Sequence, residues 1–317
     1  MTAGELTQHL VKKIRGVVFP VLTPFTAQGE VDSAGLRSYV EFLTDEGAET
    51  LMVTVGTSRF NVLTVEEMLG VNAVVAQAAR GKTVVIATGP PQGPASMSVE
   101  FAHHAADAGA DAMLVVYPDR FYSEDAVTAF FASIAEASPI PIMIHLTPMR
   151  SARGGIASYS PDLLERLAGL DNLAGIKEEM LDGGLTYAYN RRLSDRFAII
   201  GGAGGMRSFL TAHMWGQPAY LAGIGNFIPR VELAFVQALK EGKLDLALRI
   251  VNELEAPFFR AAVPLGWHVA LKEAMHGLGL MSPEERLPMA RVDSNAREMI
   301  RVTVLNILDN AKGILKQ

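Results

Sequence analysis

The chain has 317 residues, of which 49% are hydrophobic and 20% are charged, and its formal net charge is −6. This composition excludes a mainly disordered chain, and the length is ample for a sizeable core. The acidic balance gives no reason to expect nucleic acid or an anionic membrane as a partner. The absence of cysteine excludes disulfides, zinc–thiolate sites and a cysteine nucleophile.

The N-terminal segment, residues 1–15, is polar and charged and lacks the apolar core of a secretory signal. No stretch of the sequence approaches the ~18 uninterrupted apolar residues of a transmembrane helix. The lack of cysteine also fits a reducing compartment. We therefore expect a cytoplasmic protein that does not enter a membrane.

Short apolar runs rich in valine and isoleucine recur through the first three quarters of the sequence. Runs that are apolar almost throughout are expected for strands of a parallel sheet with both faces buried. The spacing between them leaves room for one helix each time. The eight candidate strands are residues 16–22, 49–55, 83–88, 111–117, 140–146, 173–177, 197–202 and 219–224.

The segments between these runs carry helical periodicity. Residues 33–48 place apolar side chains at three- and four-residue steps, and Asp32 or Ser33 can begin this helix. Residues 97–110 follow the same pattern. Alternating strands and helices of this kind predict an α/β fold, specifically a TIM (β/α)₈ barrel, within residues 1–240.

After the last candidate strand the sequence has only helical patterns. The first of them completes the barrel, and no low-complexity linker precedes the others. We therefore expect residues 241–317 to form a C-terminal helical extension that packs on the barrel and is not an independent domain. The four helical patterns are residues 229–242, 245–263, 266–279 and 295–315.

One lysine, Lys177, ends a candidate barrel strand, in the segment LAGIKEEM. Catalytic groups of TIM barrels lie at the C-terminal ends of the strands. An ammonium group in the barrel mouth is costly to desolvate, so its pKa should fall and free an amine that forms Schiff bases with carbonyl compounds. The alternative is a strand-end lysine that reaches solvent or pairs with Glu178 or Glu179.

His145 ends the fifth candidate strand and is therefore expected beside Lys177, which ends the sixth. An imidazole there could act as a general acid or base near neutral pH. The alternative is a buried histidine that is hydrogen-bonded to the backbone.

Three segments that follow strands could bind anionic groups. Thr57 and Ser58 present two hydroxyls and adjacent backbone N–H groups that could hold a carboxylate, although an ordinary turn is the alternative. The glycine-rich residues 201–205 follow the seventh strand, where barrels often bind phosphate, but such turns are common. Arg150 and Arg153 could pair with an anion or be solvated loop charges.

The order of these motifs resembles the dihydrodipicolinate synthase / N-acetylneuraminate lyase family of pyruvate-dependent aldolases. The match runs over nearly the whole chain, including its helical C-terminus, and the GIKE segment is its most specific element. The matching segments are GVVFPVLTPF (16–25), GTS (56–58), Pro148 with Arg150, GIK (175–177), the glycine-rich turn and AGIGN (222–226).

The resemblance implies a TIM barrel, usually a homotetramer built as a dimer of dimers, whose lysine forms a Schiff base with pyruvate or another 2-oxo acid. It implies no metal and no organic cofactor. By position it assigns the Schiff base to Lys177, carboxylate binding to Thr57 and Ser58, a place beside the substrate to Gly223 and Ile224, and a second carboxylate to Arg150.

The chain also departs from the family pattern. The strand-five tyrosine that usually relays protons, in a YN.P pattern, is replaced by His145 in HLTP. The usual GTTGE is GTSRF, which introduces Arg59 and Phe60, and the common PYY pattern becomes YPDRFY at 117–122. These changes indicate a divergent member with its own substrate, and Arg59 and Arg150 suggest a further anionic group on it.

The leading hypothesis is therefore a lyase that forms or cleaves a carbon–carbon bond between pyruvate, or a related 2-oxo acid, and an aldehyde. A sugar acid is a second kind of substrate that fits. The same lysine imine would also support a dehydratase or deaminase that acts on a 2-keto-3-deoxy acid. A third alternative is a non-catalytic protein that binds 2-oxo acids.

Overall fold

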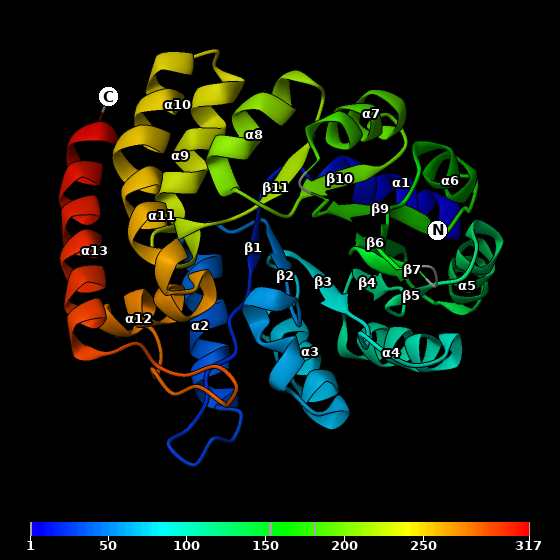
Figure 1. The fold of residues 1–317 in the computed structure, drawn as a ribbon, viewed down its shortest axis with the longest axis horizontal. Coiled ribbons are helices and arrows are strands. Elements are labelled where there is room, and N and C mark those ends of the chain that lie inside the picture. The colour runs from blue at the N-terminus through cyan, green and yellow to red at the C-terminus, as the bar shows by residue number, and fades with distance from the viewer. Residues whose placement is uncertain (1, 152–153, 181, 317) are drawn as a thin grey trace.

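The computed structural model describes residues 2–151, 154–180 and 182–316. At its centre, eight parallel strands form a closed barrel in which the last strand pairs with the first (Figure 1). This arrangement confirms the predicted TIM barrel. In order around the barrel the strands are β1 (Gly16–Pro20), β2 (Thr50–Met52), β3 (Val84–Thr88), β4 (Ala112–Val116), β6 (Ile142–Leu146), β9 (Leu173–Glu178), β10 (Ala198–Gly201) and β11 (Ala219–Leu221).

Helices follow the strands and surround the barrel (Figure 1). The first of these begins at Asp32, whose carboxylate accepts a hydrogen bond from the N–H of Gly35 at 2.9 Å. The surrounding helices are α2 (Ser33–Asp45), α3 (Val65–Ala79), α4 (Ala95–Ala108), α5 (Glu124–Ala137), α6 (Pro161–Leu167), α7 (Gly183–Leu193), α8 (Gly205–Met214) and α9 (Pro229–Lys240).

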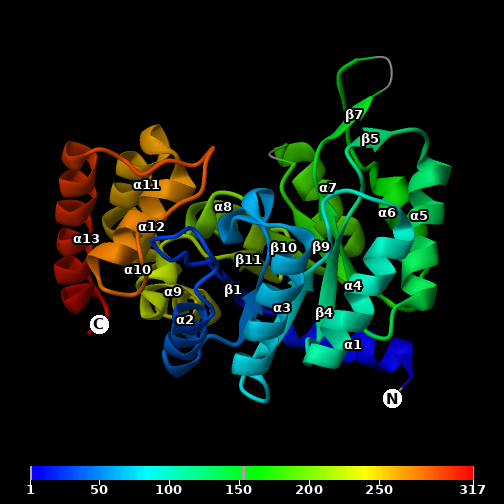
Figure 2. The same ribbon diagram turned by 90° about the horizontal axis from the view of Figure 1, so that it is seen from below.

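An N-terminal helix, α1 (Ala3–Lys13), lies across the N-terminal end of the barrel (Figure 2). The largely polar sequence of this segment does not predict a helix. Thr2 and Glu5 begin the helix with reciprocal side-chain to backbone hydrogen bonds. Leu10 and Ile14 are buried in one hydrophobic cluster with side chains of the barrel strands. The helix therefore closes the end of the barrel that lies opposite the expected catalytic mouth.

A small sheet projects from the other end of the barrel (Figure 2). It consists of β5 (Arg120–Phe121), β7 (Met149–Ser151) and β8 (Ile156–Ala157), which come from the loops after β4 and β6. These strands have two or three residues each, which is too short for any recognisable alternation. The sheet raises one side of the barrel rim.

The C-terminal extension consists of helices, as the sequence predicted. The pattern at 245–263 is not one regular helix, because a π-helical turn, η4, interrupts it. Such turns often accompany functional sites. The elements are α10 (Leu244–Ile250), η4 (Val251–Glu255), α11 (Ala256–Ala262), the 3₁₀ turn η5 (Val263–Leu265), α12 (Trp267–Gly277) and α13 (Ser294–Ile314).

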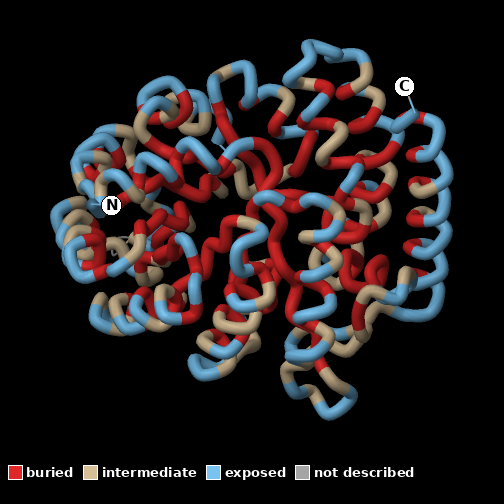
Figure 3. Tube along the Cα trace, turned by 180° about the vertical axis from the view of Figure 1, so that it is seen from behind, coloured by how far each residue is buried: buried red, intermediate tan, exposed pale blue. Residues whose placement is uncertain are grey.

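The extension shares its core with the barrel. Phe258 and Leu271 belong to the same hydrophobic cluster as Phe19 and Leu51 of strands β1 and β2. The long helix α13 packs on α11 and α12 and buries one side, while its other side is exposed (Figure 3). In the described part of the chain, no helix has both the length and the apolar character that crossing a membrane requires.

Candidate active site

Lys177 lies near the end of β9 and points into the C-terminal mouth of the barrel. Its side chain is almost completely buried, with 1% of the residue exposed. The strand must approach β10 closely here, since a Cβ atom at Gly175 would lie 2.1 Å from the carbonyl oxygen of Ala198. The glycine of the GIK motif thus lets β9 take the position that delivers the lysine.

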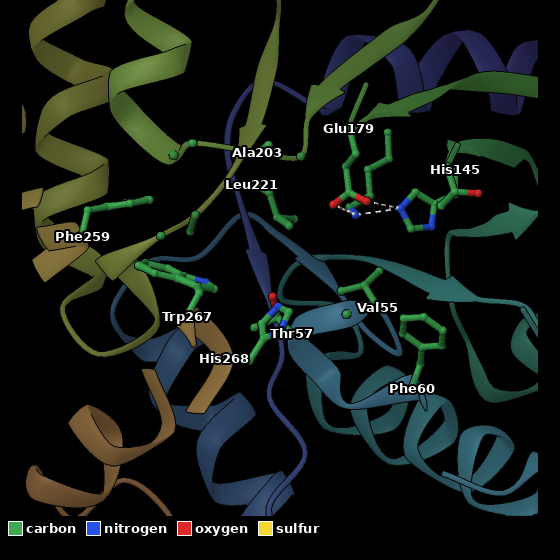
Figure 4. A pocket seen from close by; sticks show the side chains of 18 residues that line it. Val55, Thr57, Phe60, His145, Glu179, Ala203, Leu221, Phe259, Trp267 and His268 are labelled. Carbon is green, nitrogen blue, oxygen red and sulfur yellow. Dashed lines mark hydrogen bonds and ion pairs between the residues drawn. The ribbon is translucent and has the colours of Figure 1, made fainter. Parts of the chain in front are cut away.

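Lys177 is one of three ionisable side chains in mutual contact (Figure 4). The register of β6 against β9 places His145 opposite Lys177, and Nε2 of the histidine is 2.9 Å from Nζ of the lysine. Glu179 completes the group, with Oε2 at 2.6 Å from the same Nε2 and with Oε1 in a hydrogen-bonded ion pair with Nζ. We call this group the Lys–His–Glu cluster.

Burial sets the charge states of the cluster. Desolvation lowers the pKa of the Lys177 ammonium, against the opposing effect of the Glu179 carboxylate. Burial and the adjacent Lys177 charge lower the pKa of the His145 imidazole. Burial alone would raise the pKa of Glu179, but the Lys177 charge and the His145 hydrogen bond bring it down to about 2. Glu179 is therefore ionised at neutral pH, and burial makes the amine form of Lys177 easier to reach than that of an exposed lysine.

The contacts at Nε2 of His145 restrict where protons lie. A ring nitrogen holds either a proton or a lone pair, so it cannot donate to Glu179 and accept from Lys177 at once. If Nε2 holds the proton, it donates to Glu179, and an uncharged Lys177 amine donates to the other carboxylate oxygen. This arrangement satisfies the 2.6 Å contact between Nε2 and Oε2. It also leaves the lone pair of Lys177 available for nucleophilic attack.

Thr57 and Ser58 lie in the short 3₁₀ turn η1 (Gly56–Ser58) after β2. The barrel mouth contains a pocket that Lys177 lines. Thr57 also lines this pocket, whereas Ser58 is fully buried and does not line it. Ser58 accepts a hydrogen bond from the Thr23 hydroxyl through its carbonyl oxygen at 2.7 Å. Its own Oγ has no hydrogen-bond partner within the described residues. Carboxylate binding by this turn stays a prediction, and Thr57 is the residue placed to do it directly.

The turn is held in an uncommon backbone conformation. Thr54 and Arg59, on either side of it, have φ angles of 61° and 68°, a left-handed region that is unfavourable for side chains such as threonine. The hydroxyl of Thr54 hydrogen-bonds the side chain of Asn72, whose amide donates to the carbonyl oxygen of Thr88 at 3.0 Å. Neighbouring elements therefore fix the position of the turn against the pocket.

The structure does not bring Arg59 or Arg150 to the pocket, which corrects the expectation that they bind an anionic substrate group. Arg59 is completely buried and donates to the carbonyl oxygens of Thr57 at 2.6 Å and His268 at 2.8 Å, and to the carboxylate of Glu285. Its role is to tie the η1 turn to the C-terminal extension. Arg150 lies in β7 on the projecting sheet, is 72% exposed and pairs with Asp119. Arg153 lies outside the described residues.

The glycine-rich turn after β10 lines the pocket, but the helix start that a phosphate would use is occupied. Glu255 of η4 accepts hydrogen bonds from the N–H groups of Met206 at 2.7 Å and Arg207 at 2.9 Å, at the beginning of α8. Burial and the neighbouring Glu232 raise the pKa of Glu255 to about 8. The suggested phosphate site is therefore filled by a side chain of the protein.

The two backbone positions expected beside the substrate differ in their exposure to the pocket. Gly223 lines it, and its N–H donates to Glu232 at 2.9 Å. Ile224, at the start of the 3₁₀ turn η3 (Ile224–Asn226), is fully buried and does not line it. The short 3₁₀ turn η2 (Phe60–Val62) adds Phe60 to the opposite wall.

The C-terminal extension supplies a wall of the pocket that the sequence analysis did not predict. The pocket has a volume of about 320 Å³, and Phe259, Trp267 and His268 line it together with the barrel residues (Figure 4). Burial and the charge of Arg59 lower the pKa of His268 to about 4, so this imidazole is neutral. Glu179 is the other unpredicted member, since the sequence suggested it only as an alternative partner of Lys177.

Comparisons with known proteins agree with this fold. The profile of the "Dihydrodipicolinate synthetase family" matches residues 13–307. A 4-hydroxy-tetrahydrodipicolinate synthase of Stutzerimonas stutzeri is 30% identical over 291 residues, which cover 91% of this chain and 96% of that protein. The corresponding enzyme of Methanothrix thermoacetophila is 28% identical, over 93% of this chain and 97% of its own.

Solved structures agree as well. The crystal structure of dihydrodipicolinate synthase from Oceanobacillus iheyensis superimposes with a TM-score of 0.84 at 25% identity, and the match covers 98% of this chain and 100% of that one. The enzyme from Aquifex aeolicus gives a TM-score of 0.81 at 25% identity, over 92% and 97% of the two chains. The resemblance inferred from the sequence is thus confirmed, and the chain belongs to the dihydrodipicolinate synthetase family and is an enzyme of the lyase class.

Proposed function

We propose that this protein is an aldolase that joins the methyl carbon of pyruvate, or of a related 2-oxo acid, to an aldehyde through a Schiff base on Lys177. The observation that carries the proposal is the buried Lys–His–Glu cluster at the end of β9. A buried amine next to a group that can hold its protons is what imine formation needs at neutral pH.

The first step forms the imine. The lone pair of Lys177 attacks the keto carbon, and the carbonyl oxygen leaves as water after it has taken up two protons. One of them comes from the amine and the other from solvent, so the nitrogen keeps one proton and the product is a protonated imine. The distance of 2.9 Å between Nε2 of His145 and the attacking nitrogen supports His145 as the group that moves these protons. The hydroxyl of Thr57 and the adjacent backbone are the groups available for the substrate carboxylate.

The second step forms the carbon–carbon bond. The protonated imine accepts electrons, so a base can remove a proton from C3 and leave an enamine. The enamine carbon attacks the aldehyde carbon, the aldehyde oxygen takes up a proton, and water then releases the product from Lys177. By the family resemblance, His145 corresponds to the usual relay tyrosine, and its contact with Glu179 supports an imidazole oriented toward the reacting nitrogen.

The proposal can be tested without knowing the aldehyde. An enamine exchanges the C3 hydrogens of pyruvate with deuterium from D₂O, which proton NMR follows directly. We expect exchange with the wild-type protein and none with Lys177→Ala. Lys272→Ala is a matched control, because Lys272 is also buried with a pKa lowered to about 8, but it pairs with Glu285 outside the pocket.

The same assay separates the non-catalytic alternative. A protein that only binds 2-oxo acids would take up pyruvate, as isothermal titration would show, and would exchange no C3 hydrogens. A dehydratase of 2-keto-3-deoxy acids would share the imine on Lys177, but no contact among the described residues that line the pocket favours it over the aldolase.

We also propose that the chain works in the cytoplasm as a homotetramer built as a dimer of dimers. The family resemblance supports the tetramer, and the absence of cysteine fits the compartment. Light scattering during size-exclusion chromatography measures the mass of the assembly. A mass of one or two chains at working concentration would contradict the tetramer.

A further inference from the structure

The pocket has a reactive end and an aromatic end. Figure 4 shows His145 and Glu179 on one side, Phe259 and Trp267 on the opposite side, and Leu221 between them. The reactive end comes from the barrel strands, and the aromatic end comes from helices α11 and α12 of the C-terminal extension. A substrate bound to Lys177 can therefore extend across the pocket toward two aromatic rings.

The two rings form a rigid, preformed surface. They stack with ring centroids 4.5 Å apart and an interplanar angle of 27°. The ring of Phe258 supports Trp267 from the side at 5.5 Å, and the guanidinium group of Arg207 lies over Phe259 at 4.1 Å. The space beside them is left open by Gly223, where a Cβ atom would lie 3.5 Å from the ring of Phe259 and 3.6 Å from that of Trp267.

The charges of the pocket do not suit a second anionic group. Among the described residues that line it, Lys177 is the only lysine or arginine, and it is consumed by the imine. Arg59 is engaged by Glu285, and Arg150 lies on the projecting sheet. Glu179 brings a negative charge to the reactive end. A carboxylate on the aldehyde would be desolvated with no cation to pair with.

We propose that the Phe259–Trp267 end of the pocket is a subsite for the uncharged ring of an aromatic aldehyde, so that the enzyme condenses pyruvate with aldehydes that carry no second anionic group. This inference rests on the proposed function. The reaction joins C3 of the pyruvate enamine to the aldehyde carbon, the aldehyde oxygen becomes a hydroxyl by taking up one proton, and hydrolysis releases a 4-aryl-4-hydroxy-2-oxo acid. The pocket volume of about 320 Å³ suits a single ring.

A matched set of aldehydes isolates charge and aromaticity. We would measure kcat/KM for condensation of pyruvate with benzaldehyde, with 4-carboxybenzaldehyde, which adds only the charge, and with propanal, which lacks the ring. We expect benzaldehyde to exceed each of the others by at least about tenfold, the effect of one lost pairing or one lost apolar contact. A value for 4-carboxybenzaldehyde that equals or exceeds that for benzaldehyde would overturn the proposal.

Substitutions at Trp267 and Gly223 test whether the preference for benzaldehyde arises at the Phe259–Trp267 end of the pocket. Trp267→Ala should raise KM for benzaldehyde about tenfold, and Trp267→Phe should restore most of the loss. Gly223→Ala is a second probe, which adds a methyl group next to the rings at a position with a negative φ of −97°. It should raise KM for benzaldehyde more than KM for propanal. An unchanged benzaldehyde KM in both Trp267→Ala and Gly223→Ala would overturn the subsite.

Arg207 could instead make the pocket accept a charged aldehyde, and a separate variant tests this alternative. If its side chain left Phe259 and turned into the pocket, it would bind the carboxylate of 4-carboxybenzaldehyde. A preference for that aldehyde that Arg207→Ala abolishes would therefore overturn our proposal. Deuterium exchange into pyruvate distinguishes failure of the aromatic subsite from failure of the proposed function, because the exchange needs no aldehyde. Exchange without turnover of benzaldehyde refutes the subsite alone, whereas no exchange refutes the proposed function.

Discussion

Replacing Glu179 with glutamine should slow proton transfer and at the same time make the Lys177 amine easier to free. The pKa of Glu179 falls from the ordinary value of 4.5 to about 2 in the folded protein. At ~1.4 kcal/mol for each pKa unit, this shift corresponds to ~3 kcal/mol of favourable interaction of the carboxylate with its surroundings. Lys177 and His145 supply that interaction, and both lose an anionic partner in the variant.

The sign of the effect on Lys177 follows from its partner. Glu179 raises the pKa of the ammonium, so its neutralisation should lower that pKa further and extend amine formation to more acidic pH. His145 loses the acceptor that holds its Nε2 proton. We therefore expect Glu179→Gln to exchange the C3 hydrogens of pyruvate ~100-fold more slowly, within the range for lost general acid–base catalysis.

Two measurements test this reasoning. Deuterium exchange gives the rate, and borohydride trapping of the pyruvate imine between pH 5 and 9 gives the titration of the amine. The acid limb of trapping should move to lower pH in Glu179→Gln. Glu178→Gln is the matched control, because Glu178 accepts hydrogen bonds from Met180 and Thr186 rather than from the cluster. Wild-type exchange in Glu179→Gln, or a trapping limb that stays in place or moves to higher pH, would refute the argument.

Further predictions concern other parts of the fold and site. Thr57→Val should raise KM for pyruvate about tenfold with a smaller effect on kcat, because the variant loses one hydrogen bond to a charged group. Equal KM values for the variant and the wild type would argue against carboxylate binding by Thr57. His145→Ala should slow deuterium exchange ~100-fold or more, and an unaltered rate would remove the histidine from the mechanism. Gly175→Ala should cost about 3 kcal/mol of unfolding free energy or prevent folding, because its Cβ would meet the carbonyl oxygen of Ala198; urea unfolding measures this, and a loss below about 1 kcal/mol would contradict it. The pKa of Glu255 is raised in the folded state to about 8, so its protonation stabilises the fold below pH 4.5 and this contribution is lost as pH rises toward 8. Glu255→Gln should therefore flatten the decline in melting temperature between pH 5 and 8, and parallel profiles would contradict it.

The barrel could be predicted because its strands obey a simple physical rule. Runs such as residues 140–146 and 173–177 are apolar almost throughout, as is expected of strands buried on both faces. Consecutive strands of a barrel are neighbours, so the adjacency of His145 and Lys177 followed from chain order alone. The rule for strand ends then identified the barrel mouth as the place where both side chains lie.

Other features depend on contacts that local sequence does not contain. Helix α1 was missed because its segment is polar overall, and only its burial against the barrel reveals Leu10 and Ile14 as core residues. Arg59 follows a candidate carboxylate-binding turn, yet its side chain does not line the pocket. It pairs instead with Glu285, which is more than two hundred residues away in the chain. Nothing near Trp267 in the sequence indicates that its helix returns to the barrel mouth.

The role of Glu179 also depends on a contact that local sequence does not contain, although this residue is close to Lys177 in the chain. It lies two residues after Lys177, where strand alternation would point it to the same side, but the sequence could not decide between an exposed partner and a catalytic one. Its contact with His145 across β6 and β9 decides this, because that contact places the carboxylate inside the pocket. The position of Lys177 at a strand end could be predicted from the sequence, whereas its contacts are known only from the packing of the barrel.

The most direct test of the account is the position of the imine. The wild-type protein would be incubated with pyruvate and borohydride, weighed by intact mass spectrometry and mapped by peptide digestion. The account predicts one reduced pyruvate adduct per chain, on Lys177, and none in Lys177→Ala. An adduct on Lys272, or no adduct at any lysine, would contradict the claim that the buried amine of Lys177 is the nucleophile.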